Sequence, residues 1–178
     1  QVYSGVFLKT VAGMSGADSS LLVAVGTAVL FPLTLLAGWL SDHIGRRPVV
    51  IAGLAIGCLS IYPVFAGWLA IGGQPASDFG GAALLMLWIT LPLALVTGPQ
   101  TALLAELFPA RTRYSAAALP HNLAAGWIGG LLPLIVALII DRTGDPLAGL
   151  WYPTVLLAIA LPVALLWLPE TRGCDLNQ

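Results

Sequence analysis

Five long apolar runs constrain this chain more than any other feature of its sequence. A helix that crosses a bilayer needs roughly 20 apolar residues, because each residue advances about 1.5 Å across a hydrocarbon core about 30 Å thick. Hydrophobic residues make up 58% of the chain and charged residues 8%, whereas about 25% of a soluble domain is charged. We therefore predict an all-α integral membrane protein, a helical bundle with spans at about 20–40, 48–71, 81–105, 115–140 and 150–168.

Residues 1–16 contain a shorter apolar piece that Lys9 interrupts. This piece is too short to cross a membrane, and we expect it to be the end of a truncated sixth helix. No charged segment with a cleavage site precedes the first full span, so we do not expect a signal peptide.

The composition also argues against several classes of partner. Seven basic residues and a net charge of −1 do not supply the basic surface that nucleic-acid binding requires. Cys58 and Cys174 offer neither a disulfide framework nor the spacing of a metal site. Lys9 is the single lysine, and it does not follow a glycine-rich phosphate-binding loop. We expect no metal and no cofactor.

Basic residues are distributed unequally between the two sides of the predicted membrane. The polar breaks between spans must alternate in side, and cytoplasmic loops carry an excess of Lys and Arg. This rule places the breaks 41–47 and 106–114, with the C-terminus, in the cytoplasm of a multi-pass protein of the inner (plasma) membrane. That side holds Arg46, Arg47, Arg111, Arg113 and Arg172, against Lys9 and Arg142 on the other.

Tryptophans mark the ends of the predicted spans. Trp88 and Trp127 lie deeper and need a packing or cavity role. The others are expected in the aromatic belts at the membrane surfaces, and they are Trp39, Trp68, Trp151 and Trp167.

The first break carries the most specific motif. Gly38 and Asp42 are four residues apart, so they share one helix face, and the glycine permits close approach of another helix. Asp42 ends a helix, where the dipole disfavours an anion, so it needs a cation or the N-terminus of another helix as its partner. Gly45 permits a tight turn before Arg46 and Arg47. This G-x-x-x-D-x-x-G-R-R pattern between two spans resembles the signature loop of the major facilitator superfamily of secondary transporters.

Two further motifs share this resemblance. Glu106, Arg111 and Arg113 lie in a segment similar to the E-x-x-P-x-x-x-R motif after helix ten of sugar porters and metabolite:proton symporters. Glu170 and Arg172 lie in Pro-Glu-Thr-Arg-Gly, which resembles the motif after helix twelve. We expect these five residues to form a charge network on the cytoplasmic side.

The stretch 98–130 looks most like the metabolite:proton symporter family. The resemblance covers the whole chain as helices eight to twelve with the tail of helix seven, the C-terminal six-helix half of the fold. It implies symport of a small organic metabolite (a carboxylate, an osmolyte or an aromatic acid) with protons by alternating access. The missing N-terminal half is then the chain's partner, and a sugar-porter-like facilitator is the alternative.

Polar residues within the spans are candidates for the substrate or proton site. Thr97 and Gln100 lie on one stripe of the third span, and His121 and Asn122 lie in the fourth. His121 is the one ionisable residue inside a span away from its ends, a position that usually serves function. Hydrogen bonding between helices is the alternative for all four.

Two readings from other classes remain open at the level of sequence. Gly13-Met14-Ser15-Gly16 fits the motif of an intramembrane serine protease with His121 as base, and Ser41-Asp42-His43 has the residue types of a triad. Ser15 precedes the first full span in a polar stretch, and three adjacent residues cannot converge as a triad does. A non-transporting membrane scaffold is the other reading, and it leaves the three cytoplasmic motifs unexplained.

Overall fold

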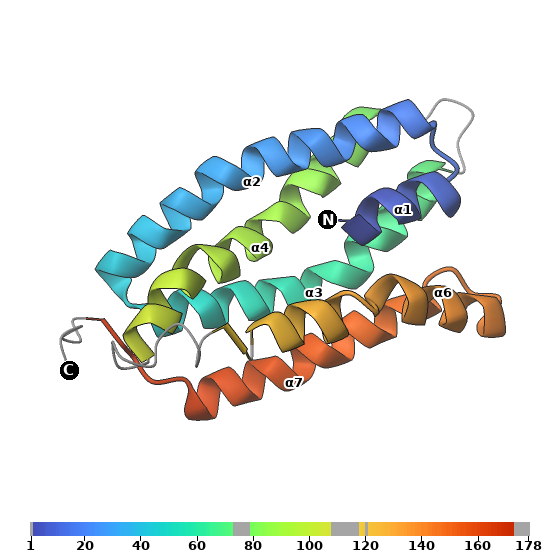
Figure 1. Cartoon of the computed structure of the whole chain (residues 1–178). Coiled ribbons are helices and arrows are strands. Elements are labelled where there is room, and N and C mark those ends of the chain that lie inside the picture. Colours follow the sequence, from blue (N-terminus) through green and yellow to red (C-terminus); the bar gives the residue numbers. More distant parts are fainter. Residues whose placement is uncertain (1, 73–78, 108–117, 120, 173–178) are drawn as a thin grey trace.

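The computed structural model describes residues 2–72, 79–107, 118–119 and 121–172. Within these ranges the chain is helical and contains no strand, which confirms the predicted all-α class. Five helices are long and apolar enough to cross a membrane: Gly16–Ile44, Arg46–Gly72, Phe79–Leu107, His121–Thr143 and Ala148–Trp167. The short helix α1 (Val2–Thr10) precedes them, and successive helices run back and forth along the bundle (Figure 1).

Helix α4 (Phe79–Leu107) is the centre of the bundle, with α2 (Gly16–Ile44) and α3 (Arg46–Gly72) packed against it. Helix α7 (Trp151–Trp167) packs on α3. A Cβ on Gly98 of α4 would stand 2.7 Å from the Thr34 oxygen and 2.9 Å from the Gly38 nitrogen, both backbone atoms of α2. The two helices therefore touch backbone to backbone, and Gly98 is the residue that permits it.

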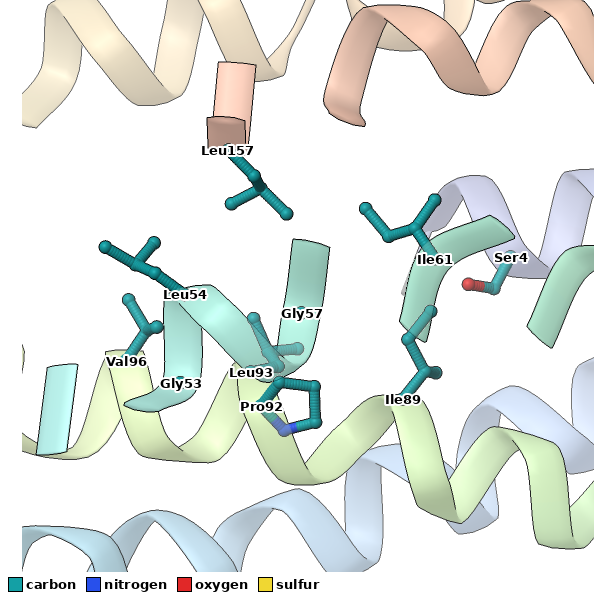
Figure 2. A pocket seen from close by; sticks show the side chains of 10 residues that line it. All are labelled: Ser4, Gly53, Leu54, Gly57, Ile61, Ile89, Pro92, Leu93, Val96 and Leu157. Carbon is teal, nitrogen blue, oxygen red and sulfur yellow. The ribbon is translucent and has the colours of Figure 1, made fainter. Parts of the chain in front are cut away.

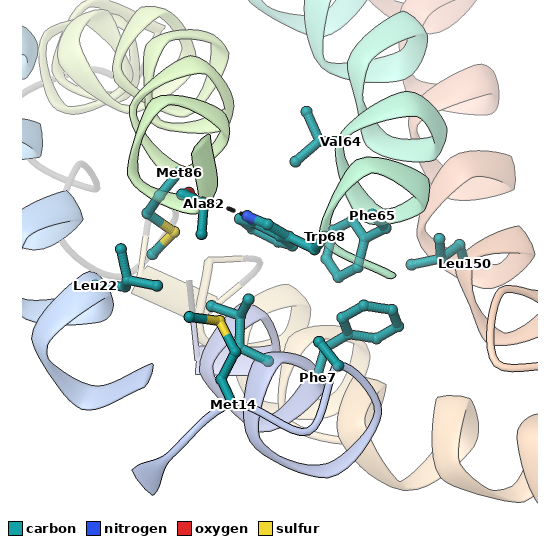
Figure 3. Packing of buried hydrophobic residues seen from close by; sticks show 11 residues of the cluster. Phe7, Met14, Leu22, Val64, Phe65, Trp68, Ala82, Met86 and Leu150 are labelled. Atoms are coloured by element: carbon teal, nitrogen blue, oxygen red, sulfur yellow. Dashed lines mark hydrogen bonds between the residues drawn. The ribbon is translucent and has the colours of Figure 1, made fainter. Parts of the chain in front are cut away.

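The main apolar core lies at the end of the bundle away from the α2–α3 turn. It joins α1, α2, α3 and α4 around Trp68, whose indole nitrogen donates to the Ala82 carbonyl at 3.1 Å (Figure 3). Trp68 is 1% exposed, so its prediction as a belt residue is wrong. Trp39, Trp151 and Trp167 are exposed. Position near a span end does not tell which way a ring points, because helix rotation decides that.

The fourth predicted span, at about 115–140, contains the membrane-length helix His121–Thr143, and its first part has an irregular backbone. A π-helix, η1 (Ala124–Gly129), stands before α6 (Leu132–Thr143), with a turn at Gly130 and Leu131. Gly130 fits this turn because a Cβ there would collide with the Gly126 carbonyl oxygen. Every residue from 121 to 131 is exposed, so little of the described chain packs on the segment. The chain then turns through the 3-10 helix η2 (Ala148–Leu150) into α7.

Candidate functional site: an arginine cluster and a histidine pair

One buried guanidinium organises the polar end of the bundle. Arg46, the first residue of α3, pairs with Asp42 near the end of α2 and with Glu106 near the end of α4. Its Nη2 and Nε lie 3.0 and 3.3 Å from the two carboxylate oxygens of Glu106, and Nη1 also donates to the Ser41 hydroxyl at 2.8 Å. Arg46 is 9% exposed. One cation therefore ties three helices together.

The turn that presents Arg46 depends on a glycine. Gly45 ends α2 with φ 118°, a left-handed conformation that other residues rarely adopt. A Cβ there would stand 2.5 Å from a carboxylate oxygen of Glu170. Both the backbone angle and the nearby Glu170 carboxylate disfavour a side chain at position 45. The glycine predicted to permit a tight turn therefore also leaves room for Glu170.

Glu170 comes from the far end of the chain and caps α3. Its carboxylate accepts from the backbone N–H of Arg46 at 2.8 Å and of Arg47 at 3.1 Å. These are groups that a helix leaves unpaired at its N-terminus, where a negative charge is also favourable. Partial burial opposes ionisation, but the backbone donors from Arg46, Arg172 and Arg47 prevail and hold the pKa of Glu170 below its ordinary value of 4.5.

The C-terminal part of the chain is attached at two more points. In the tail beyond α7, the Thr171 hydroxyl donates to Glu106, and Thr171 is 3% exposed. Near the end of α7 itself, the Leu165 carbonyl accepts from the Arg47 guanidinium at 2.6 Å. We call Ser41, Asp42, Arg46, Glu106 and Thr171 the arginine cluster. Figure 1 shows the tail crossing the same end of the bundle as the α2–α3 turn.

The five residues of the predicted charge network are placed differently from one another. Glu106 pairs with Arg46, which was not among those five, whereas Glu170 acts as a helix cap and Arg172 contributes its backbone N–H to Glu170. Arg111 and Arg113 lie outside the described residues.

Sequence reasoning missed two members of the cluster, Ser41 and Thr171. Ser41 is fully buried; it accepts from Arg46 and donates to the Gly38 carbonyl at 2.7 Å. Hydroxyl residues are common in membrane helices, and no spacing sets these two apart. Their position directly beside motif carboxylates was the one available indication.

The candidate substrate residues form a second, looser group. Gln100 Nε2 lies 3.2 Å from His121 Nδ1, which joins α4 to the helix that begins at His121. Thr97 instead donates to the Leu93 carbonyl of its own helix at 2.8 Å. Asn122 lies beside an open groove that Ala118, Leu119, Leu123 and Trp127 line. The structure therefore brings two of the four candidate residues, Gln100 and His121, into contact.

An apolar cavity of about 230 Å³ lies between α3, α4 and α7 (Figure 2). Gly53 and Gly57 leave room on the α3 side, and Pro92 and Leu157 face them. Ser4 is the one hydroxyl among its lining side chains. The cavity therefore lacks the polar groups that would recognise a charged metabolite.

The residues of the protease reading have other roles. Ser15 caps α2: its hydroxyl accepts from the Asp18 backbone N–H at 3.1 Å and donates to the Asp18 carboxylate at 2.7 Å. Ser41 and Asp42 both bind Arg46. His43 contacts the Trp39 carbonyl through Nδ1 at 2.8 Å. Ser15 is thus a helix cap, Ser41 and Asp42 belong to an ion-pair cluster, and His43 makes a surface contact. These roles explain the serine, aspartate and histidine residues that suggested a protease.

Comparison with known proteins decides the family. The family described as "Sugar (and other) transporter" matches residues 2–178, essentially the whole chain. This chain belongs to that family. It is thus a multi-pass membrane protein of the major facilitator superfamily, as its motifs indicated, and a relative of transporters rather than of enzymes.

Three relatives illustrate the range of the family. A citrate-proton symporter of Salmonella typhi is 30% identical over 176 residues, which are 97% of this chain and 39% of that protein. A citrate-proton symporter of Klebsiella pneumoniae is 32% identical over 84% of this chain and 33% of its own length. An ectoine/proline transporter of Corynebacterium glutamicum is 27% identical over 95% and 32%. The chain thus spans under two fifths of these relatives, and no solved structure matches it.

Proposed function

We propose that this chain is the C-terminal half of a secondary transporter that moves a small carboxylate-bearing metabolite with protons by alternating access. The observation that carries the proposal is the arginine cluster. One cation and the tail join the ends of α2, α3 and α4, which is where a rocking bundle must be held and released. The matching family supports the transporter class, and the citrate-proton symporters among the relatives support coupling to protons.

The substrate class follows from what the relatives' names have in common. Citrate, proline and ectoine differ in size and net charge, but each carries a carboxylate. Within the described residues of the membrane-length helices, His121 is the ionisable side chain set beside the half-buried Gln100 and the exposed Asn122. An imidazole N–H can donate to a carboxylate, and histidine is the side chain that ordinarily changes charge near neutral pH.

Uptake by cells that express the full-length transporter tests the function. Radiolabelled citrate, proline, ectoine and glucose are offered with and without a protonophore. We expect at least one carboxylate solute to accumulate above its external concentration and to lose that accumulation with the protonophore. Equilibration of glucose that ignores the protonophore would instead establish the sugar-facilitator alternative.

The gating role of the arginine cluster has its own test. Asp42→Asn removes a charge from Arg46 but keeps the side-chain shape. We expect uptake to fall roughly tenfold, about 1.4 kcal/mol, while equilibrium binding of the substrate stays within twofold. Asp141→Asn, at an exposed site of α6, is the matched control. Equal loss of binding and uptake in Asp42→Asn would contradict gating.

Two further expectations concern completeness and orientation. Alternating access needs two halves, so residues 1–178 alone should insert into vesicles without concentrating substrate.

We also propose that the arginine cluster and the C-terminus face the cytoplasm of the inner membrane. A reporter enzyme active in the cytoplasm, fused to the C-terminus, should be active; activity of a periplasmic reporter there would reverse the orientation.

A further inference from the structure

The contact between Gln100 and His121 also indicates which ring nitrogen of His121 carries the proton. The atom of Gln100 that faces the ring is the amide nitrogen Nε2, 3.2 Å from His121 Nδ1. An amide nitrogen donates and does not accept, so Nδ1 must be the acceptor. A neutral imidazole with an acceptor at Nδ1 carries its proton at Nε2. The orientation of Gln100 thus selects one of two tautomers.

Within the part of the chain that the structure describes, His121 is exposed and its Nε2 has no hydrogen-bond partner. The titratable groups described on the neighbouring helices have other partners or lie further along their helix. On α4, Glu106 is bound to Arg46 and Thr171; on α7, the Tyr152 hydroxyl contacts the Ile128 carbonyl at 3.4 Å. The helix that carries His121 has its next titratable residue at Asp141.

We propose that Gln100 is a positioning residue that fixes His121 as the Nε2–H tautomer, so that the ring offers one directed donor to a substrate carboxylate. The substrate part rests on the function proposed above, whereas the tautomer part does not. The tautomer matters because a ring protonated at Nδ1 would present the lone pair of Nε2 to an anionic oxygen of the substrate. A proton gained at Nδ1 would displace the Gln100 amide nitrogen, which links the two residues to proton uptake.

Gln100→Glu separates this role from simple packing. The two side chains have nearly the same shape, but the carboxylate only accepts. A neutral His121 must then carry its proton at Nδ1 to satisfy Glu, which reverses the tautomer. Gln100→Leu removes the selection and should give a mixture. Thr97→Val is the control, since Thr97 lies on the same helix and bonds the Leu93 carbonyl.

The measurement is nitrogen NMR of the full-length transporter with isotope-labelled histidine, at alkaline pH where the ring is neutral. The His121 signals are assigned by their loss in His121→Gln. We expect a protonated Nε2 in the wild type and in Thr97→Val, and a protonated Nδ1 in Gln100→Glu. The same tautomer in the wild type and in Gln100→Glu would overturn the proposal, and Gln100→Leu answers the same question if Gln100→Glu does not fold.

Citrate uptake then tests the substrate part. Losing one hydrogen bond to a charged group costs about 1.4 kcal/mol, so KM for citrate should rise about tenfold in Gln100→Glu, with kcat less affected. A reversed tautomer with unchanged KM would overturn the role in substrate binding. If the wild type transports neither citrate nor any other solute of the panel, the proposed function fails, while the NMR result still decides the tautomer.

Discussion

The arginine cluster and the segment 121–131 are both polar regions between helices, but they are held in different ways. Arg46 is buried and reaches three elements at once, and each carboxylate around it has at least one further contact or a solvent-facing side. Among the described residues His121 has one polar contact, with Gln100, and the eleven residues from 121 to 131 are all exposed. One region is complete within this chain, and the other presents an open surface.

This difference indicates where stability and where function should reside. A buried ion pair that loses one partner leaves an uncompensated charge, which is costly. An exposed membrane helix with polar side chains instead keeps its donors for something outside the chain. We therefore expect mutations in the cluster to lower stability in addition to their effect on gating, and those in 121–131 to change transport with little effect on stability. Four predictions test this division, and all use the full-length transporter.

The largest effect is expected from Arg46→Ala. It leaves the partly buried Glu106 without its cation, and because Asp42 is half exposed we take the low end of the usual cost, about 3 kcal/mol. Unfolding in mixed detergent micelles measures the loss. Arg47→Ala removes one contact, to the Leu165 carbonyl, and should cost about 1 kcal/mol or less. Equal losses in the two variants would mean that Arg46 is not the organising residue.

Gly98→Ala should come next. Its Cβ would meet backbone atoms of α2 at 2.7 and 2.9 Å, which cannot move aside without shifting the helix, so we expect a loss of about 2 kcal/mol. Gly38→Ala is the matched comparison, because its Cβ would stand 3.6 Å from the Gly98 oxygen, an ordinary contact. Thermal unfolding of both variants compares them, and a greater loss in Gly38→Ala would refute this account of the crossing.

The cap of α3 should depend on pH. Because the folded-state pKa of Glu170 lies below the ordinary 4.5, its contribution is complete above that value and disappears as pH falls through the lowered one. The difference in unfolding free energy between wild type and Glu170→Gln should be about 1 kcal/mol at neutral pH and shrink below pH 4.5. Asp141→Asn controls for nonspecific acid effects. A difference that persists unchanged in acid would exclude the carboxylate as its source.

The smallest effect on stability is expected in the open region. A Cβ on Gly126 of η1 would meet nothing within 4 Å, so Gly126→Ala should change the unfolding free energy by less than about 0.5 kcal/mol. If this surface faces the other half of the transporter, uptake should fall although stability does not. Unchanged uptake and stability together would make the segment lipid-facing.

Much of the architecture was predictable because it depends on local sequence patterns. Runs of about 20 apolar residues predict membrane-length helices whatever they pack against, and the described residues contain five such helices. The pairing of Asp42 with Arg46 was also predictable. An anion at a helix C-terminus is stabilised by a nearby cation, and the turn at Gly45 places Arg46 four residues after Asp42. The family motifs added the transporter class, which composition alone does not specify.

What the tertiary structure decided concerns the rotation and crossing of helices. The sequence suggested Gly38 as the close-contact glycine, but the crossing geometry assigns the tighter fit to Gly98. Thr171 reaches Glu106 across 65 positions of chain, and Trp68 turns inward despite its place near a span end. In a chain this apolar nearly every helix face is hydrophobic, so periodicity does not mark an inner side. Packing against neighbours sets each helix's rotation, and only then do distant polar side chains find one another.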